Sequence, residues 1–164
     1  MKTLLILRHA KSSWKQHTPT DHDRPLNNRG KRDALRMAKL VEEQAFCPDL
    51  ILASTAKRAR LTAEAVAVRL TGSDVIRLEP RLYLASMDAI VSVLQEASDR
   101  VNCLMVVGHN PGLEELARVL TGGAEPLVTG ALVNVQLPIE KWDALGVTDS
   151  GHLVGRWIPR ALED

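Results

Sequence analysis

The chain has 164 residues, enough for one domain with a substantial core, and its 45% hydrophobic and 25% charged residues are typical of a globular protein. Lys and Arg number 21 and Asp and Glu 20, so a formal net charge of +1 offers no global attraction to nucleic acid or to a membrane surface. Any affinity for anions must therefore be local.

The apolar segments and the cysteines bear on where the protein resides. The first apolar run, 3–7, is too short for the core of a signal peptide, and no later stretch approaches the roughly 20 apolar residues of a membrane span. The two cysteines, Cys47 and Cys103, are too few for a disulfide framework, and their apolar neighbours favour buried free thiols. We therefore expect a cytoplasmic protein.

Up to residue 120, short apolar runs rich in Leu, Ile and Val alternate with helical segments. This alternation is typical of an α/β fold, and the continuous apolar runs suit central parallel strands covered on both faces. The expected strands are 3–7, 49–54, 75–78 and 103–108, and the expected helices are 30–45, 56–70, 87–97 and 113–120. The expected buried face of the first helix consists of residues at helical spacing, namely Leu35, Ala38, Val41 and Ala45.

The pattern changes after Gly122 and Gly123. Residues 133–137 alternate apolar and polar side chains, as in a half-exposed strand, and 153–158 indicate a last strand after an irregular connection over 138–151. No repeat or linker is evident. We expect a single domain over residues 1–164, an α/β three-layer sandwich with a mostly parallel central sheet and helices on both faces.

Arg8 and His9 come directly after the first expected strand and are followed by Lys11 and two serines. In open α/β sheets, ligands bind where the chain leaves the carboxyl ends of the strands. Positive charge and hydrogen-bond donors at such a place can surround a phosphate dianion. A structural histidine at the end of a strand is the alternative.

A second strand–histidine junction lies at His109, directly after the apolar run 103–108. Asn110 suits a helix N-cap and Pro111 suits the first helical position, so a helix is expected just beyond His109. Its N-terminus would favour a bound anion. Two such junctions in one small domain favour a functional site over an ordinary turn.

The segment 54–63 adds a third basic feature, at the start of the second expected helix. Ser54 and Thr55 can cap this helix, and Arg58 then lies in its first turn, one turn before Thr62 on the same face. Basic residues there oppose the helix dipole, and such a departure from a local rule often marks a functional site. Solvated surface arginines are the alternative.

A fourth stretch places Arg24 in the loop after the first strand. Pro25 biases Arg24 towards an extended conformation that could hold it over the site. Asp21 or Asp23 could orient that arginine or donate a proton, although an ordinary polar loop would look the same.

No metal or cofactor is expected. His9 and His109 have no Cys, Asp or His at metal-ligand spacing, and the chain contains neither HExxH nor paired CxxC. The Gly122-Gly123 pair lacks the Lys-Ser/Thr of a phosphate-binding P-loop, and there is no GxGxxG.

Taken together, these residues resemble the histidine phosphatase superfamily, with its phosphoglycerate mutase-like fold, and within it the short SixA-type phosphohistidine phosphatases. The segments that carry the resemblance follow one another in the family order: 8–10, 24–26, 54–59 with 62–63, and 107–112. The C-terminal third matches only in its strand-like character.

The resemblance implies a metal-independent phosphatase that works through a phosphohistidine intermediate. His9 would be the nucleophile, and the phosphate pocket would be completed by Arg8, Arg24, Arg58 and His109. The expected substrate is a phosphohistidine-bearing protein, and a phosphate or sulfate anion would fit the same pocket. Nucleic acid and membranes are not expected as partners.

Two departures from the family pattern bear on the substrate. Ala10 stands where the family usually has Gly, a small change. Many members also carry a general-acid Glu after the third strand. This chain has Glu79 there, a candidate proton donor or orienting group that comes early for the role, and then no other acid up to Leu84. An alcohol leaving group would lose about 100- to 10,000-fold without general acid help, whereas imidazole leaves with far less assistance.

The short path between Arg58 and His109 also leaves no long insertion to close over a small substrate, which suits a protein substrate. The alternatives are a phosphatase for small phosphomonoesters and a non-catalytic phosphate-binding module.

Overall fold

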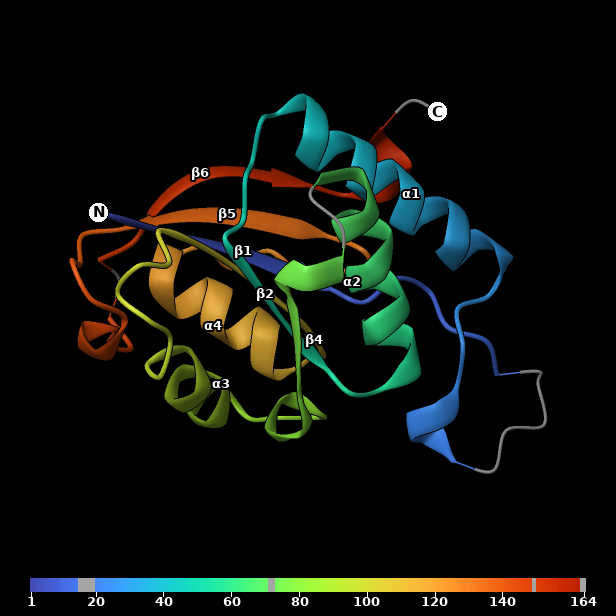
Figure 1. The fold of residues 1–164 in the computed structure, drawn as a ribbon, viewed down its shortest axis with the longest axis horizontal. Coiled ribbons are helices and arrows are strands. Elements are labelled where there is room, and N and C mark those ends of the chain that lie inside the picture. The colour runs from blue at the N-terminus through green and yellow to red at the C-terminus, as the bar shows by residue number, and fades with distance from the viewer. Residues whose placement is uncertain (15–19, 71–72, 149, 163–164) are drawn as a thin grey trace.

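The computed structural model describes residues 1–14, 20–70, 73–148 and 150–162. Within these ranges six strands form one sheet, in the order β3-β2-β4-β1-β5-β6 (Figure 1). The strands are β1 Lys2–Arg8, β2 Leu50–Ser54, β3 Ile76–Glu79, β4 Cys103–Gly108, β5 Leu132–Leu137 and β6 His152–Trp157. The first four are mutually parallel, and β5 runs antiparallel to both of its neighbours. The prediction of a mostly parallel central sheet is confirmed.

Two helices cover each face of this sheet (Figure 1). They are α1 Asn28–Glu43 and α2 Lys57–Leu70 on one face, and α3 Met87–Leu94 and α4 Gly112–Thr121 on the other. Short 3-10 turns complete the described chain: η1 Asp21–Asp23, η2 Ser73–Val75, η3 Pro80–Leu82, η4 Trp142–Ala144 and η5 Pro159–Ala161. None of the helices in the described ranges is long and apolar enough to cross a membrane.

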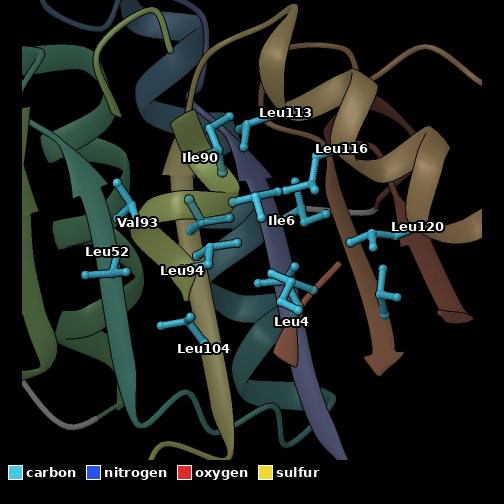
Figure 2. Packing of buried hydrophobic residues seen from close by; sticks show 14 of the residues in the cluster. Leu4, Ile6, Leu52, Ile90, Val93, Leu94, Leu104, Leu113, Leu116 and Leu120 are labelled. Atoms are coloured by element: carbon cyan, nitrogen blue, oxygen red, sulfur yellow. The ribbon is translucent and has the colours of Figure 1, made fainter. Parts of the chain in front are cut away.

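Successive side chains of the central strands point to opposite faces of the sheet and so divide the apolar core into two layers. Leu4 and Ile6 of β1 face α3 and α4, whereas Leu5 and Leu7 face α1 and α2. Figure 2 shows the first layer, in which leucines of α4 and apolar side chains of α3 lie over Leu4 and Ile6. Each fully buried side chain of this kind contributes about 1.5–3 kcal/mol to the stability of the fold. Because β1 buries such side chains in both layers, it is the apolar centre of the molecule.

The buried face of α1 differs from the expectation. Leu35 is 57% exposed, and Ala45 lies beyond the end of the helix. The apolar residues that α1 buries are Ala34, Met37, Ala38, Leu40 and Val41. Ala38 and Val41 lie on both the expected and the observed stripe, and the observed one includes the longer apolar side chain of Met37 in place of Leu35.

Two further expectations were wrong. Gln136 is exposed as the alternation predicts, but Asn134 on the same face is buried, because its register partner Leu5 and the nearby Leu132 belong to the core layer under α1 and α2. Cys47 is exposed in the turn between α1 and β2, where the apolar residues nearby in sequence do not cover it. Cys103 is partly buried, and burial raises the pKa of its thiol to about 12.

A close backbone contact fixes the chain that follows β1. A Cβ atom on Gly30, in the first turn of α1, would lie 1.9 Å from the carbonyl oxygen of Lys11. The same oxygen accepts a hydrogen bond from the backbone N–H of Asn27, and Ser12 pairs with Leu26 in an isolated bridge. Gly30 therefore allows α1 to pack directly on the segment that leaves β1.

We expect Gly30→Ala to lower the free energy of unfolding by about 1–3 kcal/mol, because the new methyl group collides with backbone. In an open helical position the same change would instead stabilise by about 1 kcal/mol. Urea denaturation measures the difference. Gly146→Ala, where a Cβ meets no atom within 4 Å, is the control. A Gly30→Ala protein as stable as the parent would contradict this account.

Candidate active site

The two predicted strand–histidine junctions meet at one edge of the sheet. Arg8 and Gly108 are register partners on the adjacent parallel strands β1 and β4, so His9 and His109 leave the sheet side by side. Their ring centroids are 5.1 Å apart, and the side chains are 7% and 3% exposed. The sheet register alone therefore brings the two imidazoles together.

His9 is held as a neutral ring, and among the described residues only one of its two nitrogens has a hydrogen-bond partner. Its Nδ1 lies 2.8 Å from the carbonyl oxygen of Ala10, which can only accept, so Nδ1 carries the proton and donates. Burial lowers the pKa of His9 to about 4, and the guanidinium groups of Arg58, Arg8 and Arg24 act in the same direction. At neutral pH the lone pair on Nε2 is therefore free.

Arg58 reaches this edge from the first turn of α2, as predicted, and is 2% exposed. Its Nη1 donates to the backbone oxygen of Asp21 (2.8 Å), and its Nη2 lies 3.1 Å from the Asp21 carboxylate. The buried hydroxyl of Thr62 donates to the Arg58 carbonyl (2.8 Å) and accepts from the N–H of Ala10 (3.1 Å). Thr62 thus ties the turn that carries Arg58 to the chain beside His9.

His109 is oriented by one partner on each ring nitrogen. Nη2 of Arg58 lies 3.4 Å from Nδ1 and can only donate, so Nδ1 accepts and Nε2–H donates to Ser54 Oγ (2.8 Å). Burial first, and then the nearby His9 and Arg58, lower the pKa of His109 to about 3. Ser54 also accepts from the N–H of Ala56, as expected of a residue at the start of α2.

The helix after His109 begins at Gly112, between the expected first helical position at Pro111 and the start of the expected range 113–120. Pro111 occupies the N-cap position of α4 and Gly112 is its first residue, so Asn110 does not cap it. The Asn110 side chain instead donates to the carbonyl oxygen of Leu127 (2.7 Å). Asn110 therefore holds the loop between α4 and β5 beside the site, through the carbonyl oxygen of Leu127.

Asp21 connects the basic residues of the site. Its carboxylate accepts from Tyr83 Oη (2.5 Å), Arg24 Nε (3.0 Å) and Arg58 Nη2. The hydrogen bond from Tyr83, and then those from the two arginines, hold the pKa of Asp21 at about 2. At neutral pH Asp21 has no proton to give, so of the two roles considered for it only that of an orienting group fits.

Arg24 and Arg8 complete the basic lining. Arg24 is 8% exposed, donates to Ser12 Oγ (2.6 Å) and lies over the Trp14 ring. Arg8 donates to the carbonyl oxygen of Leu127 (3.1 Å), and burial lowers its pKa. Within the described chain, Nε of Arg8 and Nε of Arg58 are buried without a hydrogen-bond partner. Each of these two arginines therefore keeps an unused donor.

Glu79 does not reach the site, contrary to the suggestion that it could donate a proton there. It ends β3 and turns back to accept from the N–H of Arg81 (3.1 Å) and from its guanidinium (2.9 Å). Those hydrogen bonds lower its pKa. Tyr83, four residues on, is the residue of this segment that approaches His109, with ring centroids 5.5 Å apart.

A pocket of about 310 Å³ opens at these residues. All five predicted phosphate-site residues line it, namely Arg8, His9, Arg24, Arg58 and His109, and so does the candidate Asp21. The lining residues that the sequence did not assign to the phosphate are Lys11, Ser12, Trp14, Leu84, Asn110 and Thr129. Four cationic side chains face one carboxylate there, which suits a dianion. No group of three His, Cys, Asp or Glu side chains able to hold a metal ion occurs among the described residues.

Comparison with known proteins identifies the family. The family model of the histidine phosphatase superfamily, branch 1, matches residues 4–83. An uncharacterised protein of Mycobacterium leprae is 31% identical over 163 residues, which cover 96% of this chain and 93% of that protein.

Two solved structures are also similar. The putative phosphohistidine phosphatase SixA from Agrobacterium tumefaciens is 28% identical, with a TM-score of 0.82 over 96% of this chain and 98% of that one. The protein histidine phosphatase SixA complexed with tungstate is 23% identical, with a TM-score of 0.80 over 98% of this chain and 99% of that one. The chain therefore belongs to the histidine phosphatase superfamily and is a phosphatase of the SixA type.

Proposed function

We propose that residues 1–164 work as one domain that removes the phosphoryl group from a phosphohistidine on another protein, through phosphorylated His9. The observation that carries this proposal is the state of His9. Its Nδ1–H is held by the Ala10 carbonyl, its pKa is about 4, and its free Nε2 lies beside cationic donors. A neutral imidazole with a free lone pair is a competent nucleophile at neutral pH.

In the first step Nε2 of His9 attacks phosphorus in line with the leaving group. The new Nε2–P bond forms as the bond from phosphorus to the substrate imidazole breaks, and the bonding pair leaves with that imidazole. A leaving ring protonated on its other nitrogen departs neutral. Positive charge appears on His9, where the Ala10 carbonyl accepting from Nδ1–H stabilises it.

In the second step a water molecule attacks the phosphorus of phospho-His9, the P–Nε2 bond breaks, and inorganic phosphate leaves. We assign the cationic side chains of Arg8, Arg24 and Arg58 to the oxygens of the transferred group. Neutral His109 joins them by turning its Nε2–H from Ser54 Oγ to one of these oxygens. Charge in phosphoryl transfer is spread over these oxygens, so fixed cationic donors act where it develops. Asp21 holds two of the guanidinium groups in place.

The absence of a protonated carboxylic acid among the described residues that line the pocket supports phosphohistidine as the substrate class. Of the acids considered, Asp21 is ionised and Glu79 lies outside the pocket. An alcohol leaving group needs such a proton, whereas imidazole does not. A phosphatase for small phosphomonoesters stays as the second candidate, because the Tyr83 hydroxyl lies at the site and could donate in its place.

The experiment that tests this proposal compares substrates and traps the intermediate. We expect kcat/KM for a phosphohistidine peptide to exceed that for an alkyl phosphate by about 100-fold or more, because no acid assists the alcohol. A labelled phosphoenzyme should appear after rapid quenching at alkaline pH and be absent in His9→Gln. Comparable kcat/KM for the two substrates would favour the second candidate, and a labelled His9→Gln protein would contradict the nucleophile.

We expect Arg58→Ala to lower kcat/KM by about 100- to 1,000-fold, the usual cost of losing one donor to the transition state. The loss in the free energy of unfolding should be smaller than the free-energy equivalent of that rate loss. Arg60→Ala is the matched control, because Arg60 lies in the same helix but forms only a half-exposed pair with Glu64. A larger effect on stability than on rate would make Arg58 structural.

The lowered pKa values of His9 and His109 predict that acid destabilises the fold. The unfolded chain binds these protons near pH 6.5 and the native state only near pH 4 and 3, so the free energy of unfolding falls as pH decreases from 6.5. His9→Gln should lose less stability than the parent between about pH 7 and about pH 4.5. Urea denaturation at both pH values measures this, and equal losses would show that His9 does not contribute.

A further inference from the structure

We propose that a basic groove beside the active-site pocket binds an acidic segment of the protein that carries the phosphohistidine. This inference rests on the proposed function and adds the chemistry of the partner. The basic groove has a volume of about 530 Å³ and is lined by Lys11, Ser12, Ser13, Trp14, Leu26, Asn27, Asn28, Arg29 and Lys31.

The basic groove is continuous with the pocket that contains His9. Lys11, Ser12 and Trp14 line both hollows. A phosphohistidine side chain that reaches His9 must therefore bring the residues next to it in its own chain close to this junction. The groove is in the right place to contact the protein around the phosphorylated residue, not the phosphoryl group itself.

The charges of the basic groove are largely uncompensated. Among the described residues, Lys11 and Lys31 form no ion pair, and no Asp or Glu lines the groove. Arg29 has a partner in Asp33, at 3.6 Å, but Asp33 is buried and is shared with Arg36 at 3.2 Å. An acidic segment would supply the carboxylates that this surface lacks.

Trp14 stands at the junction of the two hollows and gives the surface an apolar contact. Its side chain is 74% exposed, and the Arg24 guanidinium lies 3.4 Å from the ring centroid. The stacking on buried Arg24 restrains the ring. Exposed aromatic side chains beside charged ones are typical anchors of protein interfaces.

Backbone contacts hold together the segments that line the basic groove. The Lys11 carbonyl contacts Gly30 and accepts from Asn27, and the N–H of Ser13 donates to the carbonyl oxygen of Pro25 (2.9 Å). A surface that is already ordered loses little conformational entropy on binding. A few exposed charges on such a surface can therefore produce measurable selectivity.

A protein is a better fit than nucleic acid. The net charge of the whole chain is only +1, and three cationic side chains line the basic groove, too few for an extended polyanion. A short run of Glu or Asp in a folded partner matches that number.

The test uses two phosphohistidine peptides of equal length, one with Glu flanking the phosphohistidine and one with Gln. We expect the wild-type kcat/KM to be about 10-fold higher for the Glu peptide at low salt, and the preference to shrink as salt is added. The double variant Arg29→Glu with Lys31→Glu should abolish this preference. Lys31→Glu alone, which breaks no observed ion pair, should reduce it.

The control variant is Arg100→Glu, which changes the net charge by the same amount as Lys31→Glu alone. Arg100 is exposed and precedes the first residue of β4, so it lies at the amino-terminal end of that strand, away from the histidines at the carboxyl end. It should keep the preference for the Glu peptide. Free phosphohistidine should be hydrolysed equally by the parent and all variants, since it cannot reach the basic groove.

Binding of a fluorescent, unphosphorylated Glu peptide, followed by anisotropy, separates the two proposals. If the parent hydrolyses no phosphohistidine, the proposed function fails, while weaker peptide binding by the double variant alone still supports the groove. Equal kcat/KM for the Glu and Gln peptides, or equal peptide binding by the double variant and the parent, would overturn the groove proposal. Tighter binding of single-stranded RNA than of the Glu peptide would also overturn it.

Discussion

The parallel pairing of β1 with β4 is the constraint on which the site depends. Because Arg8 is the register partner of Gly108, the next residue on each strand is a histidine leaving the same edge of the sheet. Both strands are buried between two helical layers, so the positions of the two imidazoles are fixed by the apolar core (Figure 2). A shift of one register position would separate the rings that now lie 5.1 Å apart.

Asp21 supplies the one carboxylate among the described residues that line the pocket, while Glu114 acts on Arg8 from outside it. Arg8, Arg24 and Arg58 lie near two histidines that burial keeps neutral, and Asp21 is the acid that lines the pocket. Concentrated positive charge disfavours protonation of His9 and leaves it nucleophilic. The same charge attracts the phosphoryl dianion. Asp21 limits the repulsion between Arg24 and Arg58 and holds both in place.

Local sequence patterns were sufficient to predict the strand–histidine junctions and the position of Arg58, because neighbouring residues determine each of them. A junction is an apolar run followed by His, and Arg58 lies among basic residues in the helical turn that follows a capping residue. Contacts between segments that are distant in the chain could not be predicted from these local patterns. Tyr83 meets Asp21 across 62 residues, and Glu79 turned out to pair with Arg81 outside the pocket. The exposure of Leu35 and the burial of Asn134 likewise depend on which elements pack beside them.

The most direct test of the central claim is a crystal structure of the protein with vanadate, a mimic of the transferred phosphoryl group. We expect vanadium bonded to Nε2 of His9, with oxygens within hydrogen-bond distance of Arg8, Arg58 and His109. Vanadate bound elsewhere, or held by the arginines with His9 turned away from it, would contradict the account.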